Sequence, residues 1–179
     1  MTIDEKLKQT NITRILVVDD TPENLVAAKN YFENLDVKVD YATNGVSAIE
    51  KITQSYEEKD VYSLLLSDLQ MEERNSGLDV VREGSKYLIP SFIVTGRNYD
   101  QPHNHHGPST QIEPYLGSIA GKKEDENIWM QVLEKVVDNI SEGEGTPFYK
   151  ALSRYRSYIG GMSENIADLS MTRFNHLKR

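Results

Sequence analysis

Short apolar and β-branched segments alternate with longer amphipathic segments through most of the chain. The short segments predict β-strands at 14–19, 37–42, 61–67, 91–95 and 118–120. Between them, apolar residues recur at the spacing of one helix face. Strands that alternate with helices form a parallel sheet with helices on both faces. The pattern therefore predicts an α/β fold in which a five-stranded parallel sheet is doubly wound by helices.

The predicted helices lie near 22–35, 46–56, 78–87 and 128–140. The third is weak because Gly84 interrupts it. The last has the strongest helical pattern in the chain and carries Trp129 as a core or interface residue. Residues 97–117 are rich in Pro, His, Asn and Gly and predict a long irregular segment. The segment contains His103, His105 and His106. Their spacing fits no common closed metal site, which favours a solvated loop.

The same pattern divides the chain into four parts. Residues 1–12 are a polar lead-in, 13–140 form the α/β body, and 141–147 have the composition of a linker. Residues 148–179 are predicted to be a basic amphipathic helical tail. We expect the apolar face of this tail to pack on the body or on a second copy of the chain.

The amino-acid composition excludes several classes of function. The chain has no Cys, so disulfides and thiolate chemistry are excluded. No long apolar run predicts a membrane span or a signal peptide, so we expect a cytoplasmic protein. The net charge of −8 argues against general nucleic-acid binding. The tail, however, carries six basic and two acidic residues, which leaves nucleic-acid binding through the tail as an alternative.

Polar side chains gather where the predicted strands end. Because parallel strands all end at one edge of the sheet, these side chains are expected to meet there. They are Asp19, Asp20, Asp68, Thr95 and either Lys122 or Lys123. Clustered carboxylates favour Mg²⁺, and a carboxylate beside such an ion can act as a nucleophile. A Lys and a hydroxyl can hold phosphoryl oxygens, so the set indicates phosphoryl chemistry.

Several motifs, in order, resemble the receiver domain of two-component response regulators, a CheY-like family with a flavodoxin-like fold. They are ILVVDD at 15–20, LLSDLQM at 65–71, GLD at 77–79, IVTG at 93–96 and IAGK at 119–122. The resemblance covers about residues 13–140. It implies a signalling switch whose enzymatic activity is limited to its own phosphorylation and dephosphorylation. It also implies a histidine kinase or phosphotransfer protein as the phosphoryl donor.

The resemblance also implies a role for each site residue. Asp68 is the expected phospho-acceptor. Asp19 and Asp20 are expected to hold Mg²⁺ together with Asp68 and the backbone carbonyl of Gln70. The expected contacts of the phosphoryl group are Thr95 and Lys122; counting from Ile119 at the strand end favours Lys122 over Lys123.

The sequence departs from the family pattern in places. Glu72 stands where the family usually has Pro, and Ile119 stands where an aromatic switch residue is common, with Tyr115 as the candidate replacement. The tail is too short for a usual DNA-binding output domain. We therefore expect output by protein contact or dimerisation. A pseudo-receiver scaffold that is never phosphorylated stays an alternative.

Overall fold

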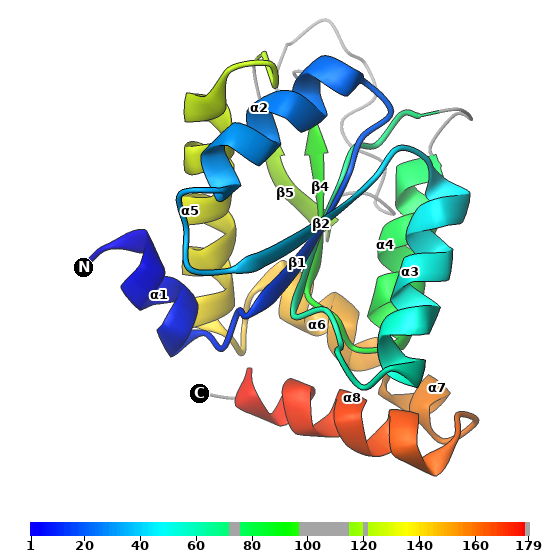
Figure 1. Ribbon diagram of the computed structural model, residues 1–179. Coiled ribbons are helices and arrows are strands. Elements are labelled where there is room, and N and C mark those ends of the chain that lie inside the picture. The colour runs from blue at the N-terminus through cyan, green and yellow to red at the C-terminus, as the bar shows by residue number, and fades with distance from the viewer. Residues whose placement is uncertain (72–75, 97–114, 120–121, 178–179) are drawn as a thin grey trace, which may run out of the picture.

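The computed structural model describes residues 1–71, 76–96, 115–119 and 122–177 (Figure 1). Its elements in chain order are α1 (Ile3–Gln9), β1 (Arg14–Val18), α2 (Pro22–Phe32), β2 (Lys38–Ala42), α3 (Gly45–Glu57), β3 (Leu64–Ser67), α4 (Ser76–Lys86), β4 (Ser91–Thr95), β5 (Leu116–Ile119), α5 (Glu126–Glu142), α6 (Pro147–Arg154), α7 (Arg156–Ile159) and α8 (Glu164–His176). The strands pair in the order β2-β1-β3-β4-β5, and every pair is parallel. The predicted α/β fold with a parallel sheet is confirmed.

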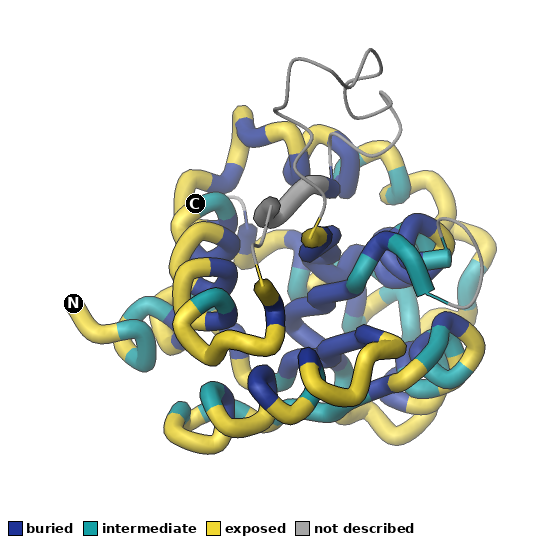
Figure 2. The backbone as a smooth tube through the Cα atoms, turned by 90° about the horizontal axis from the view of Figure 1, so that it is seen from above, coloured by how far each residue is buried: buried dark blue, intermediate teal, exposed yellow. Residues whose placement is uncertain are grey.

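Alternate residues of the inner strands face opposite sides of the sheet. In β1, Ile15 and Val17 belong to one apolar cluster, whereas Leu16 and Val18 belong to the other. The first cluster is completed by α2 and α5, and the second by α3 and α4, which lie on opposite faces in Figure 1. Figure 2 views the same layers from above, with the inner strands buried and the outer helix faces exposed. Burial on both faces explains the nearly continuous apolar runs of these strands.

Helix α4 is continuous through Gly84, contrary to the expected interruption. A Cβ atom at this position would lie 2.5 Å from Ser91 Oγ and 2.8 Å from Leu65 Cδ2. The missing side chain therefore lets α4 approach β3 and β4 closely. Here the tertiary contact outweighs the low intrinsic helix propensity of glycine.

The predicted polar lead-in contains a helix instead. Thr2 and Glu5 form a reciprocal capping box at the start of α1. Leu7 is only 1% exposed and joins the core beside α5. One buried leucine and one good cap thus hold a segment whose sequence reads as a polar lead-in.

The predicted linker begins inside α5 and reduces to a tight turn before α6. Gly143 and Gly145 adopt positive φ angles of 60° and 107°, which glycine adopts without strain. The Thr146 side chain then accepts a hydrogen bond from the backbone N–H of Tyr149 at the start of α6. This turn leads from the end of α5, which already lies at the amino-terminal edge of the sheet, into α6 (Figure 1).

The C-terminal helices α6, α7 and α8 lie below the amino-terminal ends of the strands (Figure 1). Phe148 of α6 contacts Phe92 of β4 with ring centroids 5.2 Å apart, and Phe174 of α8 is fully buried. These helices share the larger apolar cluster with β1 and α5. In the part of the chain that is described, no helix is long and apolar enough to cross a membrane.

Candidate phosphoryl site at the carboxyl edge of the sheet

The predicted site residues that the structure joins most closely come from β1 and β3. Asp19 follows β1, Asp68 follows β3, and the two strands are direct neighbours. Asp19 is 1% exposed, and the Asp68 side chain is 12% exposed. Two carboxylates in such a poorly solvated place repel each other unless a cation lies between them.

Lys123 supplies that cation, and the expectation of Lys122 is wrong. Lys123 Nζ lies 2.5 Å from Asp19 Oδ2 and 2.6 Å from Asp68 Oδ1. It also donates to the backbone carbonyl of Val94 at 3.3 Å. Lys122 is exposed. Counting residues from Ile119 cannot separate the two lysines, because the sequence between the strand end and the last helix has no periodic pattern of apolar residues.

A buried tryptophan fixes the backbone of this lysine. Trp129 Nε1 donates a hydrogen bond to the carbonyl oxygen of Lys123 at 2.9 Å. Trp129 is 1% exposed and also contacts Phe32 of α2. The sequence predicts Trp129 as a core or interface residue. Its hydrogen bond to the Lys123 backbone becomes visible only in the structure.

Asp19 is held by the start of α2. Its Oδ1 accepts from the backbone N–H of Thr21 at 3.0 Å, and Asn24 Nδ2 donates to both carboxylate oxygens at 3.0 and 3.1 Å. Asn24 is itself buried. Sequence reasoning missed this residue, although its place in the first turn of the helix after Asp19 is a usable signal. These bonds fix the orientation of the Asp19 side chain.

Asp68 lies in an environment that works against its own ionisation. Burial raises the pKa of the Asp68 carboxyl, the ammonium of Lys123 opposes that rise, and the charge of Asp19 adds to it. The backbone N–H of Gln70 donates to Asp68 Oδ2 at 2.9 Å, which fixes the side chain. The result is a positioned carboxylate with one oxygen bonded to Lys123 and the other to the chain just after β3.

Gly77 allows the first turn of α4 to pass directly over Asp68. A Cβ atom at position 77 would lie 1.7 Å from the backbone oxygen of Asp68, closer than any real contact. The backbone N–H of Gly77 donates to the carbonyl of Leu69 at 3.2 Å. The glycine of the GLD motif is therefore required by this close approach.

The other predicted residues differ in how far the structure joins them to this cluster. Thr95 is buried at the end of β4 and pairs in register with Ile119 of β5. Asp20 is exposed, and no ion pair of the described residues includes it. Tyr115 precedes β5 and so lies at the end of that strand remote from Thr95. Glu72 and the three histidines at 103, 105 and 106 lie outside the described residues.

The donor chemistry of this edge fits Mg²⁺. Asp19 and Asp68 already converge on one cation position, where the Lys123 ammonium lies, and Asp20 adds a third carboxylate beside them. Three carboxylates against one ammonium leave an excess of negative charge, and hard oxygen donors are what Mg²⁺ prefers. Within the described ranges no three carboxylate or imidazole groups form a ready-made metal site, so Asp20 would have to turn inward.

Comparison with known proteins identifies the class. A sequence model of the response regulator receiver domain matches residues 15–106, more than half of the chain. The chain therefore belongs to the response regulator receiver domain family, whose members accept phosphoryl groups in two-component signalling. None of the curated proteins matches the chain.

Among solved structures, an uncharacterized protein from Neptuniibacter caesariensis is 16% identical, with a TM-score of 0.52; the match covers 78% of this chain and 92% of that one. It has the same fold. A point mutant of the receiver domain of the histidine kinase CKI1 from Arabidopsis thaliana is 17% identical, with a TM-score of 0.42, and covers 52% and 73% of the two chains. The CKI1 receiver with Mg²⁺ and BeF₃⁻ is 22% identical, with a TM-score of 0.40, and covers 50% and 71%.

Proposed function

We propose that this chain is a response regulator that receives a phosphoryl group on Asp68 from a histidine kinase or a phosphotransfer protein. The observation that carries the proposal is the Lys123 ammonium shared by Asp19 and Asp68 at the carboxyl edge of the sheet, with contacts of 2.5 and 2.6 Å. A buried acidic pair that shares one cation offers a carboxylate that can act as a nucleophile. It also offers an ammonium that can bind an incoming anion.

The proposed transfer is a single displacement at phosphorus. A carboxylate oxygen of Asp68 attacks the phosphorus atom of a phosphohistidine, an O–P bond forms, and the P–N bond breaks with its electron pair going to nitrogen. The product is an acyl phosphate on Asp68. Attack by water on phosphorus later breaks the O–P bond, which releases inorganic phosphate and returns the carboxylate.

Each surrounding residue has a proposed part. The Lys123 ammonium binds a phosphoryl oxygen while keeping its contact with the Asp68 carboxyl group, and the Thr95 hydroxyl at the end of β4 binds another. Asn24 and Thr21 hold Asp19, and Trp129 holds the backbone of Lys123, so these three are positioning residues. Asp19, Asp20, Asp68 and the backbone carbonyl of Gln70 would hold Mg²⁺, which neutralises phosphoryl charge when bound.

The proposed output is a protein contact made by the C-terminal helices or their neighbourhood, with homodimerisation as one form of it. Tyr115, just before β5, and Tyr155, between α6 and α7, share a hydrogen bond between their hydroxyl oxygens at 3.2 Å. Strand β5 also leads to the loop that carries Lys123. A phosphoryl group that pulls on Lys123 would therefore act on β5, at whose other end Tyr115 contacts Tyr155 between α6 and α7.

The test is the intact mass of the protein after incubation with phosphoramidate and Mg²⁺, since this small donor has the P–N bond of a phosphohistidine. The native chain is expected to gain one phosphoryl group, and Asp68→Asn is expected to gain none. Asp79→Asn, which removes an exposed carboxylate on α4, is the matched control and should behave like the native chain. Chelation of Mg²⁺ with EDTA should slow the gain.

An equal gain in Asp68→Asn would assign the phosphoryl group to another residue. No gain in the native chain, together with no Mg²⁺ binding by titration calorimetry, would replace this proposal with the pseudo-receiver scaffold.

A further inference from the structure

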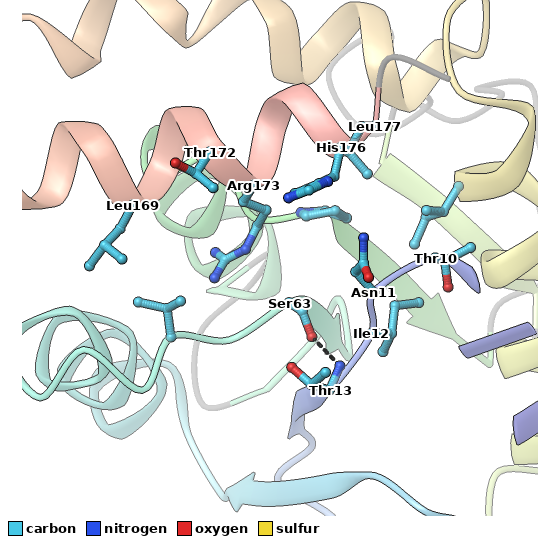
Figure 3. Close-up of a pocket in the computed structure, with 13 residues that line it drawn as sticks. Thr10, Asn11, Ile12, Thr13, Ser63, Leu169, Thr172, Arg173, His176 and Leu177 are labelled. Atoms are coloured by element: carbon cyan, nitrogen blue, oxygen red, sulfur yellow. Dashed lines mark hydrogen bonds between the residues drawn. The ribbon is translucent and has the colours of Figure 1, made fainter. Parts of the chain in front are cut away.

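A second site lies at the opposite edge of the sheet from Asp68. A pocket of about 230 Å³ opens between α8 and the chain that enters β1 (Figure 3). One wall consists of Leu169, Arg173 and His176 from α8, and the facing wall of residues 10–13 with Val61 and Ser63 before β3. The facing wall is held by a hydrogen bond from the Thr13 backbone N–H to Ser63 Oγ at 2.9 Å.

The pocket contains a guanidinium group with no acidic partner. Arg173 points from α8 into the space in Figure 3, and its Nη1 donates to the hydroxyl of Tyr56 at 2.9 Å. Within the described part of the chain, no carboxylate forms an ion pair with Arg173. Burial accordingly lowers the pKa of the Arg173 guanidinium, and only the contact with Tyr56 opposes this.

Arg14, which also lies at the amino-terminal edge, differs from Arg173 because it has acidic partners. Arg14 is paired with Asp40 at 2.6 Å and with Asp60 at 3.0 Å. Partly buried charges in folded proteins are normally compensated in this way, because desolvation without a partner is costly. Among the described residues, the partly buried Arg173 contacts the hydroxyl and the ring of Tyr56 rather than a carboxylate, and it lines an open pocket. The pocket therefore has room for an external anion beside the guanidinium.

The remaining surface of the pocket is mainly apolar. Ile12, Val61, Pro90, Leu169 and Leu177 line it around the guanidinium. An inorganic anion would leave these side chains uncovered, whereas a molecule with one charged end and an apolar body would satisfy both parts. His176 lies beside Arg173 and gives the charged end a second nitrogen donor.

We propose that this pocket binds a small carboxylic acid with an apolar body, its carboxylate against Arg173 and its body against the apolar wall. Such a ligand would bridge α8 and the amino-terminal edge of the sheet, so binding would stabilise the docked position of the C-terminal helices. The site is independent of Asp68 and needs no phosphoryl group.

The test is titration calorimetry of the 179-residue protein with hexanoate as the probe. Hexanoate is expected to bind, and 1-hexanol and inorganic phosphate are expected to bind at least about tenfold more weakly, because each supplies only half of the required chemistry. Arg173→Met should weaken hexanoate binding by about tenfold or more. Arg154→Met, which removes an exposed charge from α6, is the matched control and should leave binding unchanged.

A second measurement keeps the proposal testable if Arg173→Met does not fold. In the native protein, NMR amide shifts on adding hexanoate should change first at Thr13, Ser63 and Arg173. Equal binding by Arg173→Met and the native chain, stronger binding of phosphate than of hexanoate, or shifts confined to the Asp68 edge would each overturn the proposal. So would the absence of any heat or shift at millimolar hexanoate.

Discussion

At the scale of single residues, the ammonium of Lys123 holds Asp19 and Asp68 together, because it lies between the two carboxylates. Both carboxylates contact it, and the Lys123 side chain is 7% exposed, so water screens the three charges poorly. Removing one member of a buried ionic group leaves the others uncompensated, which is strongly destabilising. The same contacts are the ones that the proposed phosphoryl transfer uses.

The first prediction concerns the two adjacent lysines. Lys123→Met is expected to lower the free energy of unfolding by about 3 kcal/mol, because two buried carboxylates lose their shared cation. Its phosphorylation by a small donor should fall by at least about tenfold. Lys122→Met removes the same charge from an exposed position and should change stability by less than about 0.5 kcal/mol. Urea unfolding and intact mass measure both effects; equal effects in the two variants would contradict the assignment.

The second prediction concerns pH. Burial raises the pKa of Asp68, so the folded state favours the protonated carboxyl more than the unfolded state does. This preference adds to the free energy of unfolding at low pH and is lost as pH rises through the folded-state pKa. The free energy of unfolding of the native chain, measured relative to Asp68→Asn, should therefore decrease as pH rises from below about 4 toward neutrality. Urea unfolding of both proteins across this range tests it. A difference that grows with pH would mean that Lys123 outweighs the effect of burial.

Strand ends in the sequence are enough to predict that Asp19, Asp68 and Thr95 lie at one edge, because each directly follows an apolar run of a parallel strand. The choice between Lys122 and Lys123 is not available from the same reasoning, since no repeating pattern crosses the loop before α5. The bond from Trp129 that holds Lys123 joins residues whose relation appears only in three dimensions.

At the scale of elements, the site depends on how closely α4 approaches the end of β3. Gly77 lies against the backbone of Asp68, and Gly84 lies against Leu65 and Ser91. Two glycines on one helix thus set its distance from the sheet. The sequence predicts that Gly84 interrupts the helix, because helix propensity is a local property. The contacts that favour glycine at this position come from β3 and β4.

The third prediction follows from this approach. Gly77→Ala is expected to lower the free energy of unfolding by about 3 kcal/mol and to slow phosphorylation, because the new Cβ cannot fit beside the Asp68 carbonyl oxygen. Gly160→Ala is the matched control, since the nearest atom to its added Cβ is 3.9 Å away. Thermal unfolding and intact mass provide the comparison. A Gly77→Ala protein that is as stable and as active as the control would refute the close contact.

At the scale of the whole molecule, the C-terminal helices and the α/β body share one core. Phe174 is fully buried, stacks on Tyr149 of α6 and lies in the same cluster as Val17 of β1. The amphipathic pattern of the tail predicts that its apolar face is covered, but it does not say by what. The covering surface is the amino-terminal edge of the sheet, which no single segment of sequence encodes.

The fourth prediction is that body and tail unfold together. Phe174→Ala should lower the free energy of unfolding by about 3 to 5 kcal/mol and leave one transition. Fluorescence of Trp129, the only tryptophan, reports on the body, and circular dichroism reports on all helices. Asn175→Ala, an exposed neighbour on α8, should have little effect. Separate transitions seen by the two probes in the native chain would contradict a shared core.

The central claim is that Asp68 carries the phosphoryl group, and borohydride trapping tests it most directly. An acyl phosphate of aspartate is reduced to homoserine, so peptide mass mapping after treatment with phosphoramidate, Mg²⁺ and borohydride locates the modified residue. We expect homoserine at position 68 and nowhere else. Homoserine at 19 or 20, or at no position in a chain that has gained a phosphoryl group, would contradict it.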